Sequence, residues 1–353
     1  MTLSHYAGIF RTIIDMVGNT PLIKLRRASE ETGCNIYGKA EFLNPGQSVK
    51  DRIAISIIDD AIKRKQVEKG GFIVEGTAGN TGIGMTLIGA YYGLKSIVVI
   101  PRSQSTEKKE ILRILGAQIV EVAPTRYADP NHYTHYAQRL ADVLNTQHSN
   151  GAVWANQFDN IANRQAHIDT TAEEIWRQTS GEIDGFICSV GSGGTLAGVS
   201  LALKAKNPNI QIGLVDPMGS SLYDHYAHGE LKSEGSSAME GIGQSRITNN
   251  LEGATIDQAY RATDSEAMDI LYALAKEEGL FLGGSSGINL SGAIQMAKNM
   301  GKGNTIVTAL CDHGTRYMSK IFNPAFHQEN QMSSSPSASL TESETETLPD
   351  VFL

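Results

Sequence analysis

Lys50 stands at the start of a predicted amphipathic helix, in the stretch NPGQSVKDRIAISIIDDAIKRK (44–65). Ser48 is expected to be the N-cap of this helix, because apolar residues recur after it at three- and four-residue spacing. The free N–H groups of a first helical turn carry partial positive charge and therefore favour the neutral amine of a lysine over its ammonium. Carbonyl chemistry and Schiff-base formation both require a neutral amine. The alternative is a surface lysine whose stem covers apolar side chains, and the rest of the chain has to decide between the two.

A glycine-rich turn, VGSGGTLAG (190–198), follows the apolar run GFICSV and opens a second predicted helix. Its backbone N–H groups and hydroxyls would converge on one point, which suits a phosphate. The residues concerned are Gly191, Ser192, Gly193, Gly194 and Thr195. A dinucleotide site is a second interpretation, with Asp216 as the ribose-binding acid, but Leu196 stands where the third glycine of GxGxxG belongs. A turn without any ligand is the third, and the turn alone leaves it open.

Three further polar turns follow apolar runs. The small residues of EGTAGNTGIG (75–84) leave backbone amides free to close on a carboxylate, and the Asn80 amide can bond a nearby oxygen. GGSSGINLSG (283–292) presents Ser285 ahead of a helix, and NQFDN (156–160) places Gln157 after the strand-like AVWA. Together with Lys50 and the glycine-rich turn, these groups are the parts that would bind pyridoxal phosphate through a bond to Lys50.

Short β-branched runs alternate with helical patterns along the chain, which is typical of a parallel α/β sheet covered by helices. The runs are FIVEG (72–76), SIVVIP (96–101), QIVEVA (118–123), GFICSV (185–190), QIGLVDP (211–217) and TIVTALCD (305–312). Ligands of such folds bind beyond the carboxyl ends of the strands, which is where the polar turns lie. The segment 328–353 is rich in Ser, Thr and Glu and is predicted to be a disordered polar tail.

The composition excludes several classes of function. The chain has 353 residues, 41% of them apolar, and a net charge of −8, which gives no indication of nucleic-acid binding. No apolar run approaches the length of a membrane span, and the N-terminus lacks the pattern of a secretory signal. We therefore expect no membrane association and a cytoplasmic location. The three cysteines are far apart in the sequence and are expected to be buried thiols.

Two short stretches place histidines where they could share a helix face, HYTH (132–135) and HYAH (225–228). No set of Cys, Asp or Glu completes either pair, so no metal site is expected. Cys311 and His313 stand at a strand end near the presumed cofactor. A packed thiol beside a turn histidine is the preferred interpretation of these two residues, over a catalytic pair.

Seven motifs between residues 10 and 326 resemble, in order and spacing, those of the cysteine synthase and cystathionine β-synthase family of pyridoxal phosphate enzymes. They are VGNTPLIKL, NPGQSVKDR, EGTAGNTGIG, NQFDN, VGSGGTLAG, GGSSG and CDHGTRYMSKIF. The resemblance implies the α/β, two-domain parallel-sheet fold of the tryptophan synthase β-subunit-like (fold type II) enzymes. It further implies a smaller mobile domain, 46–156, a larger domain formed by 1–45 and 157–327, and a homodimer.

The resemblance also implies roles for the residues that match these motifs. Lys50 would form the Schiff base with pyridoxal 5'-phosphate, Asn80 would contact the ring hydroxyl and Ser285 would face the ring nitrogen. The phosphate would bind to Gly191, Ser192, Gly193, Gly194 and Thr195. The substrate would bind to Thr77, Ala78, Gly79, Asn80, Thr81, Gln157 and Gly241.

The implied reaction is a β-replacement, in which O-acetyl-L-serine and sulfide give L-cysteine through an aminoacrylate intermediate. A hydroxyl at the ring nitrogen does not hold that nitrogen protonated, which favours elimination of the β leaving group. Lys50, once displaced by the substrate amine, is the expected base for the Cα proton. Cystathionine β-synthase and O-phosphoserine sulfhydrylase activities are the alternatives within the family. A nicotinamide-dependent oxidoreductase and a non-catalytic binding protein are the alternatives from other classes.

Two positions bear on the choice of donor. Ala78 stands where serine is commoner in the family, which removes a hydroxyl that would serve the leaving group or the substrate. Arg246 follows the Glu240–Gly243 segment, and a phosphate-bearing donor would need a fixed cation of this kind. The preferred interpretation is a solvated loop arginine, because arginine side chains are mostly exposed. This interpretation favours O-acetylserine as the donor.

Overall fold

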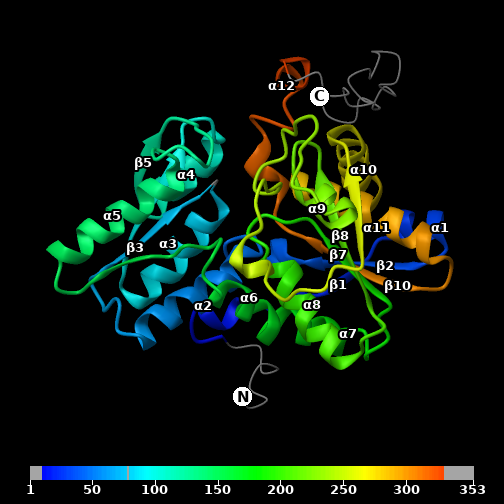
Figure 1. Ribbon diagram of the computed structural model, residues 1–353, viewed down its shortest axis with the longest axis horizontal. Coiled ribbons are helices and arrows are strands. Elements are labelled where there is room, and N and C mark those ends of the chain that lie inside the picture. The colour runs from blue at the N-terminus through cyan, green and yellow to red at the C-terminus, as the bar shows by residue number, and fades with distance from the viewer. Residues whose placement is uncertain (1–9, 78, 330–353) are drawn as a thin grey trace, which may run out of the picture.

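The computed structural model describes residues 10–77 and 79–329, which form two α/β halves side by side (Figure 1). One half is built on a four-stranded sheet whose pairings are all parallel. Its strands, in spatial order, are β5 (Gln118–Val122), β4 (Lys95–Pro101), β3 (Phe72–Gly76) and β6 (Ala152–Trp154).

The other half is built on a six-stranded sheet in which only β1 and β2 pair antiparallel. Its spatial order is β1 (Leu22–Lys24), β2 (Asn35–Ala40), β10 (Thr305–Leu310), β7 (Gly185–Cys188), β8 (Gln211–Pro217) and β9 (Gln258–Ala262). All six apolar runs predicted as strands are strands. The sequence pattern does not predict β1, β2 and β9, which lack a long apolar run.

Helices cover both faces of each sheet. The smaller sheet has α5 (Tyr133–Gln147) on one face and α2 (Lys50–Lys63), α3 (Asn80–Tyr92) and α4 (Thr106–Ile114) on the other. The larger sheet has α1 (Arg26–Thr32), α10 (Asp264–Glu278) and α11 (Gly284–Met300) on one face. Its other face carries α7 (Glu173–Gln178) and α8 (Gly194–Lys206). Between the halves, α6 (Ala162–Ala166) contacts both α2 and α8. In the larger half, α9 (Leu222–His228) follows β8 along the chain.

The apolar runs are continuous because both faces of each strand are covered. In β3, Phe72 and Val74 belong to the core under α5, whereas Ile73 belongs to the core under α2 and α3. Successive side chains of a strand point to opposite faces, so neighbouring residues enter different cores. The same burial leaves the polar turns at the carboxyl ends of the strands as the place for a site.

The start of α2 differs from the prediction, because its N-cap is Val49 rather than Ser48. The backbone at these two positions is paired with the segment that follows β10. Ser48 forms a bridge with Asp312, and Val49 N donates to Cys311 O at 2.9 Å. The Ser48 hydroxyl still accepts a hydrogen bond from Lys50 N, at 3.3 Å. This tertiary pairing fixes the first helical residue, Lys50, beside the carboxyl end of β10.

At the C-terminal end, α12 (Pro324–Glu329) takes in the first two residues of the predicted polar tail. The remainder of that segment lies outside the described residues. Over residues 10–77 and 79–329, no helix combines the length and the apolarity that crossing a membrane requires.

Candidate active site

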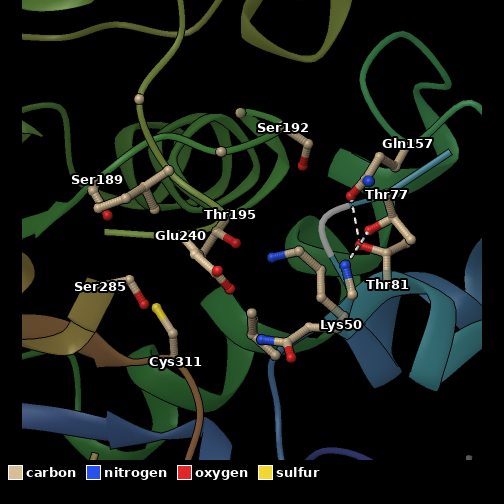
Figure 2. Close-up of a pocket in the computed structure, with 18 of the residues that line it drawn as sticks. Lys50, Thr77, Thr81, Gln157, Ser189, Ser192, Thr195, Glu240, Ser285 and Cys311 are labelled. Atoms are coloured by element: carbon tan, nitrogen blue, oxygen red, sulfur yellow. Dashed lines mark hydrogen bonds between the residues drawn. The ribbon is translucent and has the colours of Figure 1, made fainter. Parts of the chain in front are cut away.

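A pocket opens where the two halves meet, at the carboxyl ends of β3, β7 and β10 (Figure 2). It brings together twelve of the fourteen predicted site residues: Lys50, Thr77, Gly79, Asn80, Thr81, Gln157, Gly191, Ser192, Gly193, Thr195, Gly241 and Ser285. Gly194 does not line the pocket, and Ala78 lies outside the described residues. Lys50 is half-buried at the first position of α2, and Figure 2 shows its side chain pointing into the pocket.

The glycine-rich turn is shaped by close backbone approaches that leave no room for side chains. A Cβ atom on Gly191 would lie 2.3 Å from the carbonyl oxygen of Gly241, and one on Gly194 would lie 1.9 Å from Asn163 Oδ1. The first hydrogen bond of this turn of α8 runs from Ala197 N to Gly193 O. The amides of residues 194–196 therefore have no acceptor within the helix, which is the arrangement that binds an anion at a helix start.

Two buried side chains support the glycine-rich turn from behind. Asn163 Nδ2 donates to Ser192 Oγ at 2.8 Å, and His167 Nε2 lies 3.2 Å from Thr195 Oγ1. His167 belongs to a π-helical turn (His167–Ala172), and burial lowers the pKa of its imidazole to about 3. The imidazole is therefore neutral, and it fixes the Thr195 hydroxyl without placing a charge beside the turn.

The loop after β3 is tied to the 156–160 turn by side-chain hydrogen bonds. Thr81 Oγ1 donates to Gln157 Oε1 at 2.7 Å, and Gly79 N donates to Thr77 Oγ1 at 3.1 Å (Figure 2). Gln157 also lies against the buried carboxyl of Glu75. Burial raises the pKa of Glu75 to about 8, so this carboxyl is largely protonated at neutral pH. The loop thus presents small residues and oriented amides, as a carboxylate site requires.

Asn80 is held at both ends of its amide by residues that follow β10. Its Nδ2 donates to Asp312 Oδ2 at 2.6 Å, and its Oδ1 accepts from Arg316 Nη1 at 2.7 Å. Arg316 also donates to the carbonyl oxygen of Gly46, and Tyr317 donates to Asp312 Oδ2 at 2.5 Å. One N–H of Asn80 remains for a ligand in the pocket. The sequence motifs include these partners, but no local pattern predicts that they hold Asn80.

Ser285 and Cys311 lie together on the larger-sheet side of the pocket, as Figure 2 shows. Their side chains lie next to each other, and burial raises the pKa of Cys311 to about 11. The thiol is therefore protonated at neutral pH and is a poor nucleophile. His313 Nδ1 lies 3.0 Å from Thr315 Oγ1, and His313 does not line the pocket. Nothing in this geometry favours a catalytic Cys–His pair.

The predicted site lacks two charged residues of the pocket, Glu240 and, on α4, Lys108. Its side chain is buried against Gly79 and ends 2.6 Å from Glu240 Oε2. The stretch EKKEILRILGA has the composition of an exposed helix, so the sequence predicts a solvent-exposed lysine at this position. One signal was present: Lys108 precedes the fully buried Leu112 by four residues and therefore shares its face of the helix.

The interpretation of Arg246 as a solvated loop arginine is wrong. Its guanidinium makes two hydrogen bonds to Asp159, of 3.0 and 2.8 Å, and its side chain is 24% exposed. It also lies 4.7 Å from the ring centroid of Tyr127, a cation–π distance. Arg246 lines a neighbouring cavity with Tyr127 and Phe158, and its charge is already neutralised there by Asp159.

Two further interpretations concern a dinucleotide site with Asp216 and a metal site. Asp216 is fully buried and its Oδ2 accepts from Tyr223 N at 2.8 Å, so it supports the start of α9 and does not line the pocket. Within the part of the chain that the structure describes, no group of three or more His, Cys, Asp or Glu side chains could hold a metal ion.

A lysine, an anion-binding turn and an amide-rich loop, gathered between two parallel α/β layers, define an enzyme built around a phosphorylated cofactor. Residues 13–312 match the family model described as pyridoxal-phosphate dependent enzyme. The chain belongs to this family, and its cofactor is pyridoxal 5'-phosphate. Because the chain belongs to this family, the alternative of a nicotinamide-dependent oxidoreductase is excluded.

Relatives with known names cover most of the chain. Cysteine synthase 1 of Neurospora crassa is 44% identical over 94% of this chain and 88% of its own length. Cysteine synthase 1 of Emericella nidulans is 45% identical over 92% and 88%, respectively. The crystal structure of an O-acetylserine-dependent cystathionine β-synthase from Helicobacter pylori is 33% identical, with a TM-score of 0.79 over 88% of this chain and 98% of that one.

Proposed function

We propose that this protein is a cysteine synthase, which forms L-cysteine from O-acetyl-L-serine and sulfide by β-replacement. The observation that carries the proposal is the pocket itself, where Lys50, the 77–81 loop and the glycine-rich turn face one another. The names of the relatives, two cysteine synthases and an O-acetylserine-dependent enzyme, support the same reaction. Cystathionine β-synthase activity is the runner-up, because one of these neighbours carries that name.

The residues of the pocket fit pyridoxal phosphate. The amides of residues 195 and 196 and the hydroxyls of Ser192 and Thr195 would hold the phosphate, in a turn whose glycines at 191 and 194 have no room for a Cβ atom. Ser285 would face the ring nitrogen, Asn80 would use its remaining N–H on the ring hydroxyl, and Lys50 would bond to the cofactor. When bound, the cofactor withdraws electrons from the substrate α-carbon, so that its proton and the β leaving group can depart.

The protein's own groups would then bind the substrate and move its proton. Thr77, Thr81 and Gln157 would bind the carboxylate, and the Thr81–Gln157 hydrogen bond orients the glutamine amide for this purpose. The amine of Lys50, once released, would take the proton from the substrate α-carbon, because it is tethered at the helix start beside that site. Ser285 carries no negative charge, so it does not stabilise a protonated ring nitrogen.

The pairing of Arg246 with Asp159 supports O-acetylserine over O-phosphoserine as the donor. A phosphate-bearing donor needs an uncompensated cation, because a dianion is costly to desolvate. Arg246 makes both of its carboxylate hydrogen bonds to Asp159, and it lines the neighbouring cavity rather than the main pocket. O-phosphoserine remains the rival donor that the test below includes.

The test is a spectral titration of the holoenzyme with O-acetylserine, O-phosphoserine and serine, followed by an assay for cysteine with sulfide. We expect O-acetylserine to change the visible absorption of the cofactor and to give cysteine. Lys50→Ala should lose nearly all turnover, by a factor of roughly a thousand or more, because it removes both the tether and the base. Lys63→Ala, at the exposed end of the same helix, is the matched control and should keep wild-type activity. Bound cofactor without turnover would instead indicate a binding protein.

We further propose that residues 46–156 form a domain that closes on the substrate. All four strands of the smaller sheet and the 77–81 loop fall within this range, whereas the glycine-rich turn lies outside it. A carboxylate bound by the loop would draw the two halves together and exclude water. Small-angle scattering and hydrogen exchange with a carboxylate analogue should show compaction, and no change in either would contradict closure.

The assembly and the compartment are also proposals. We propose a homodimer, on the basis of the family resemblance, and a cytoplasmic location, which the free thiols of Cys34, Cys188 and Cys311 support. Light scattering of the purified protein should give twice the mass of one chain. A fluorescent fusion should distribute evenly through the cytoplasm, and accumulation in an organelle would contradict this.

A further inference from the structure

One buried ion pair lies inside the pocket and has no part in the reaction as described above. Lys108 Nζ is 2.6 Å from Glu240 Oε2, and the two side chains are only 2% and 8% exposed. Both line the pocket together with Lys50 and Ser285. Lys108 comes from α4, beside the smaller sheet, whereas Glu240 adjoins Gly241, which packs on the glycine-rich turn. The pair therefore joins the two halves across the pocket.

The ammonium of Lys108 is held close to the substrate loop. A Cβ atom placed on Gly79 would lie only 2.5 Å from Cδ of Lys108, so the lysine side chain packs directly against that loop. Its Nζ lies 4.3 Å from the ring centroid of Tyr317, another residue of the pocket wall. A desolvated ammonium in this position is a strong anion site unless a carboxylate neutralises it. Glu240 is that carboxylate.

Glu240 is anchored from outside the pocket as well. Lys320 Nζ lies 2.5 Å from its second oxygen, Oε1, and also donates to the carbonyl oxygen of Ser103 at 2.7 Å. Lys320 does not line the pocket. The carboxylate is thus fixed by two ammonium groups, and only that of Lys108 faces the ligand. At this part of the wall, Lys108 and Glu240 present one positive and one negative charge to an incoming donor.

We propose that the Lys108–Glu240 pair selects the donor by charge, which deepens the proposed function and rests on it. A donor with a neutral acetyl ester enters without placing an extra charge beside the pair. A donor with a phosphate dianion finds no uncompensated cation there, because the ammonium of Lys108 is paired with Glu240, and a dianion is costly to desolvate without one. The ammonium that would otherwise attract the phosphate is occupied by Glu240.

The test compares kcat/KM for O-phosphoserine and O-acetylserine, at one sulfide concentration, in charge variants of the pair. Glu240→Gln keeps the size of the side chain and leaves Lys108 without its counter-charge, so the ratio should rise at least about tenfold. Lys108→Met leaves Glu240 paired with Lys320 and should lower the ratio. Lys109→Met is the matched control on α4, because Lys109 pairs with Glu121 at 2.8 Å outside the pocket, and it should leave the ratio unchanged.

A binding measurement separates this proposal from the proposed reaction. Calorimetry with the phosphonate isostere of O-phosphoserine and the ketone isostere of O-acetylserine reports donor preference without turnover. If the wild type forms no cysteine, the proposed reaction is refuted. If the binding preference between the two isosteres nevertheless shifts in Glu240→Gln, the proposal that the Lys108–Glu240 pair selects the donor still stands. An unchanged preference in both Glu240→Gln and Lys108→Met would overturn the pair.

The same calorimetry includes the other neutralised cation near the site. If Asp159→Asn raises phosphonate affinity and Glu240→Gln does not, Arg246 is the selecting cation and the assignment to Lys108 is wrong. Unfolding midpoints and cofactor absorbance establish that each variant is folded and loaded. Should Glu240→Gln fail to fold, Lys108→Met alone tests the proposal, because the expected shift has the opposite sign.

Discussion

Two neighbouring residues of α2, Asp51 and Arg52, belong to two different buried clusters of charged residues. The charges of the Arg52 cluster are fully paired, whereas the Asp51 cluster has unpaired polar atoms. Arg52 donates to Glu41 and Glu174 through all three of its guanidinium nitrogens, and Lys39 adds a second cation to Glu174 at 2.6 Å. Two cations and two carboxylates are thus matched. Although burial alone raises the pKa of Glu41, Arg52 outweighs it and lowers that pKa to about 2.

The cluster around Asp51 is incompletely partnered. Asp51 shares it with Asn80, Asp312, Arg316 and Tyr317. Three of its buried atoms have no hydrogen-bond partner within residues 10–77 and 79–329: Asp51 Oδ1, Asp312 Oδ1 and Arg316 Nε. Burial raises the pKa of Asp51 to about 7, against the attraction of Arg316.

The two clusters also differ in their position, because the Asp51 cluster adjoins the pocket and the Arg52 cluster does not. Asn80 and Tyr317 line the pocket, whereas none of Lys39, Glu41, Arg52 and Glu174 does. Unsatisfied polar groups are costly in a protein interior and concentrate where function requires them. One helical turn therefore supplies Lys50 to the pocket, Asp51 to the cluster that holds Asn80, and Arg52 to a cluster that stabilises the fold.

The largest effect is expected from breaking the matched cluster. Arg52→Met removes the central cation and leaves Glu41 and Glu174 buried with only Lys39 for compensation. We expect a loss of about 3–5 kcal/mol in the free energy of unfolding at neutral pH, as for other buried pairs that lose one partner. Urea denaturation followed by circular dichroism measures it. A loss below about 1 kcal/mol would mean that the cluster contributes no more than a surface ion pair.

A smaller and pH-dependent effect is expected at Asp51. Its folded-state pKa of about 7 exceeds the ordinary value of 3.8, so the folded state retains a proton that the unfolded state releases between these values. The contribution of Asp51 to stability is therefore present below about pH 4 and is lost as the pH rises to about 7. Glu41 has the opposite sign, because its lowered pKa contributes stability that is lost only as the pH falls towards about 2.

Asp51→Asn removes the titrating group and keeps an acceptor for Gly46 N. The stability of the wild type relative to this variant should fall by roughly 1–3 kcal/mol between pH 4 and pH 7. Glu75, whose pKa is also raised, titrates in both proteins and cancels in the comparison. Urea unfolding of both proteins at several pH values is the measurement. A difference that stays constant with pH would show that Asp51 is ionised throughout.

The contrast between the clusters also marks what the sequence could predict. Lys50, the glycine-rich turn and the strands β3, β4, β7 and β8 follow from local patterns of apolar, small and capping residues. The partners of buried charges do not, because these pairs join distant parts of the chain. Asn80 and Asp312 are 232 positions apart, and Lys108 and Glu240 are 132 apart. Only the folded arrangement decides which charges meet.

The error at Ser48 has the same origin. A serine before an apolar-periodic stretch is a sound N-cap signal, but here the backbone of residues 48 and 49 pairs with Asp312 and Cys311. The error at Arg246 is of this kind too, because its partner Asp159 lies 87 positions earlier in the sequence. Base rates of exposure favour a solvated arginine, and a specific tertiary contact overrides them.

The smallest effect is expected from a third arginine environment, at the other end of α2. Arg64 pairs with Asp60 at 2.9 Å across one helical turn, with side chains 61% and 30% exposed. Such a pair gains little in water, so Arg64→Ala should change the free energy of unfolding by less than about 0.5 kcal/mol. Arg52 lies in α2 and Arg64 is its C-cap, and the two arginines differ in burial. The two losses in the free energy of unfolding therefore measure how much burial and complete pairing contribute to stability. If Arg64→Ala destabilised the protein as much as Arg52→Met, the loss at Arg52 would reflect a general sensitivity of α2, and the distinction between the clusters would fail.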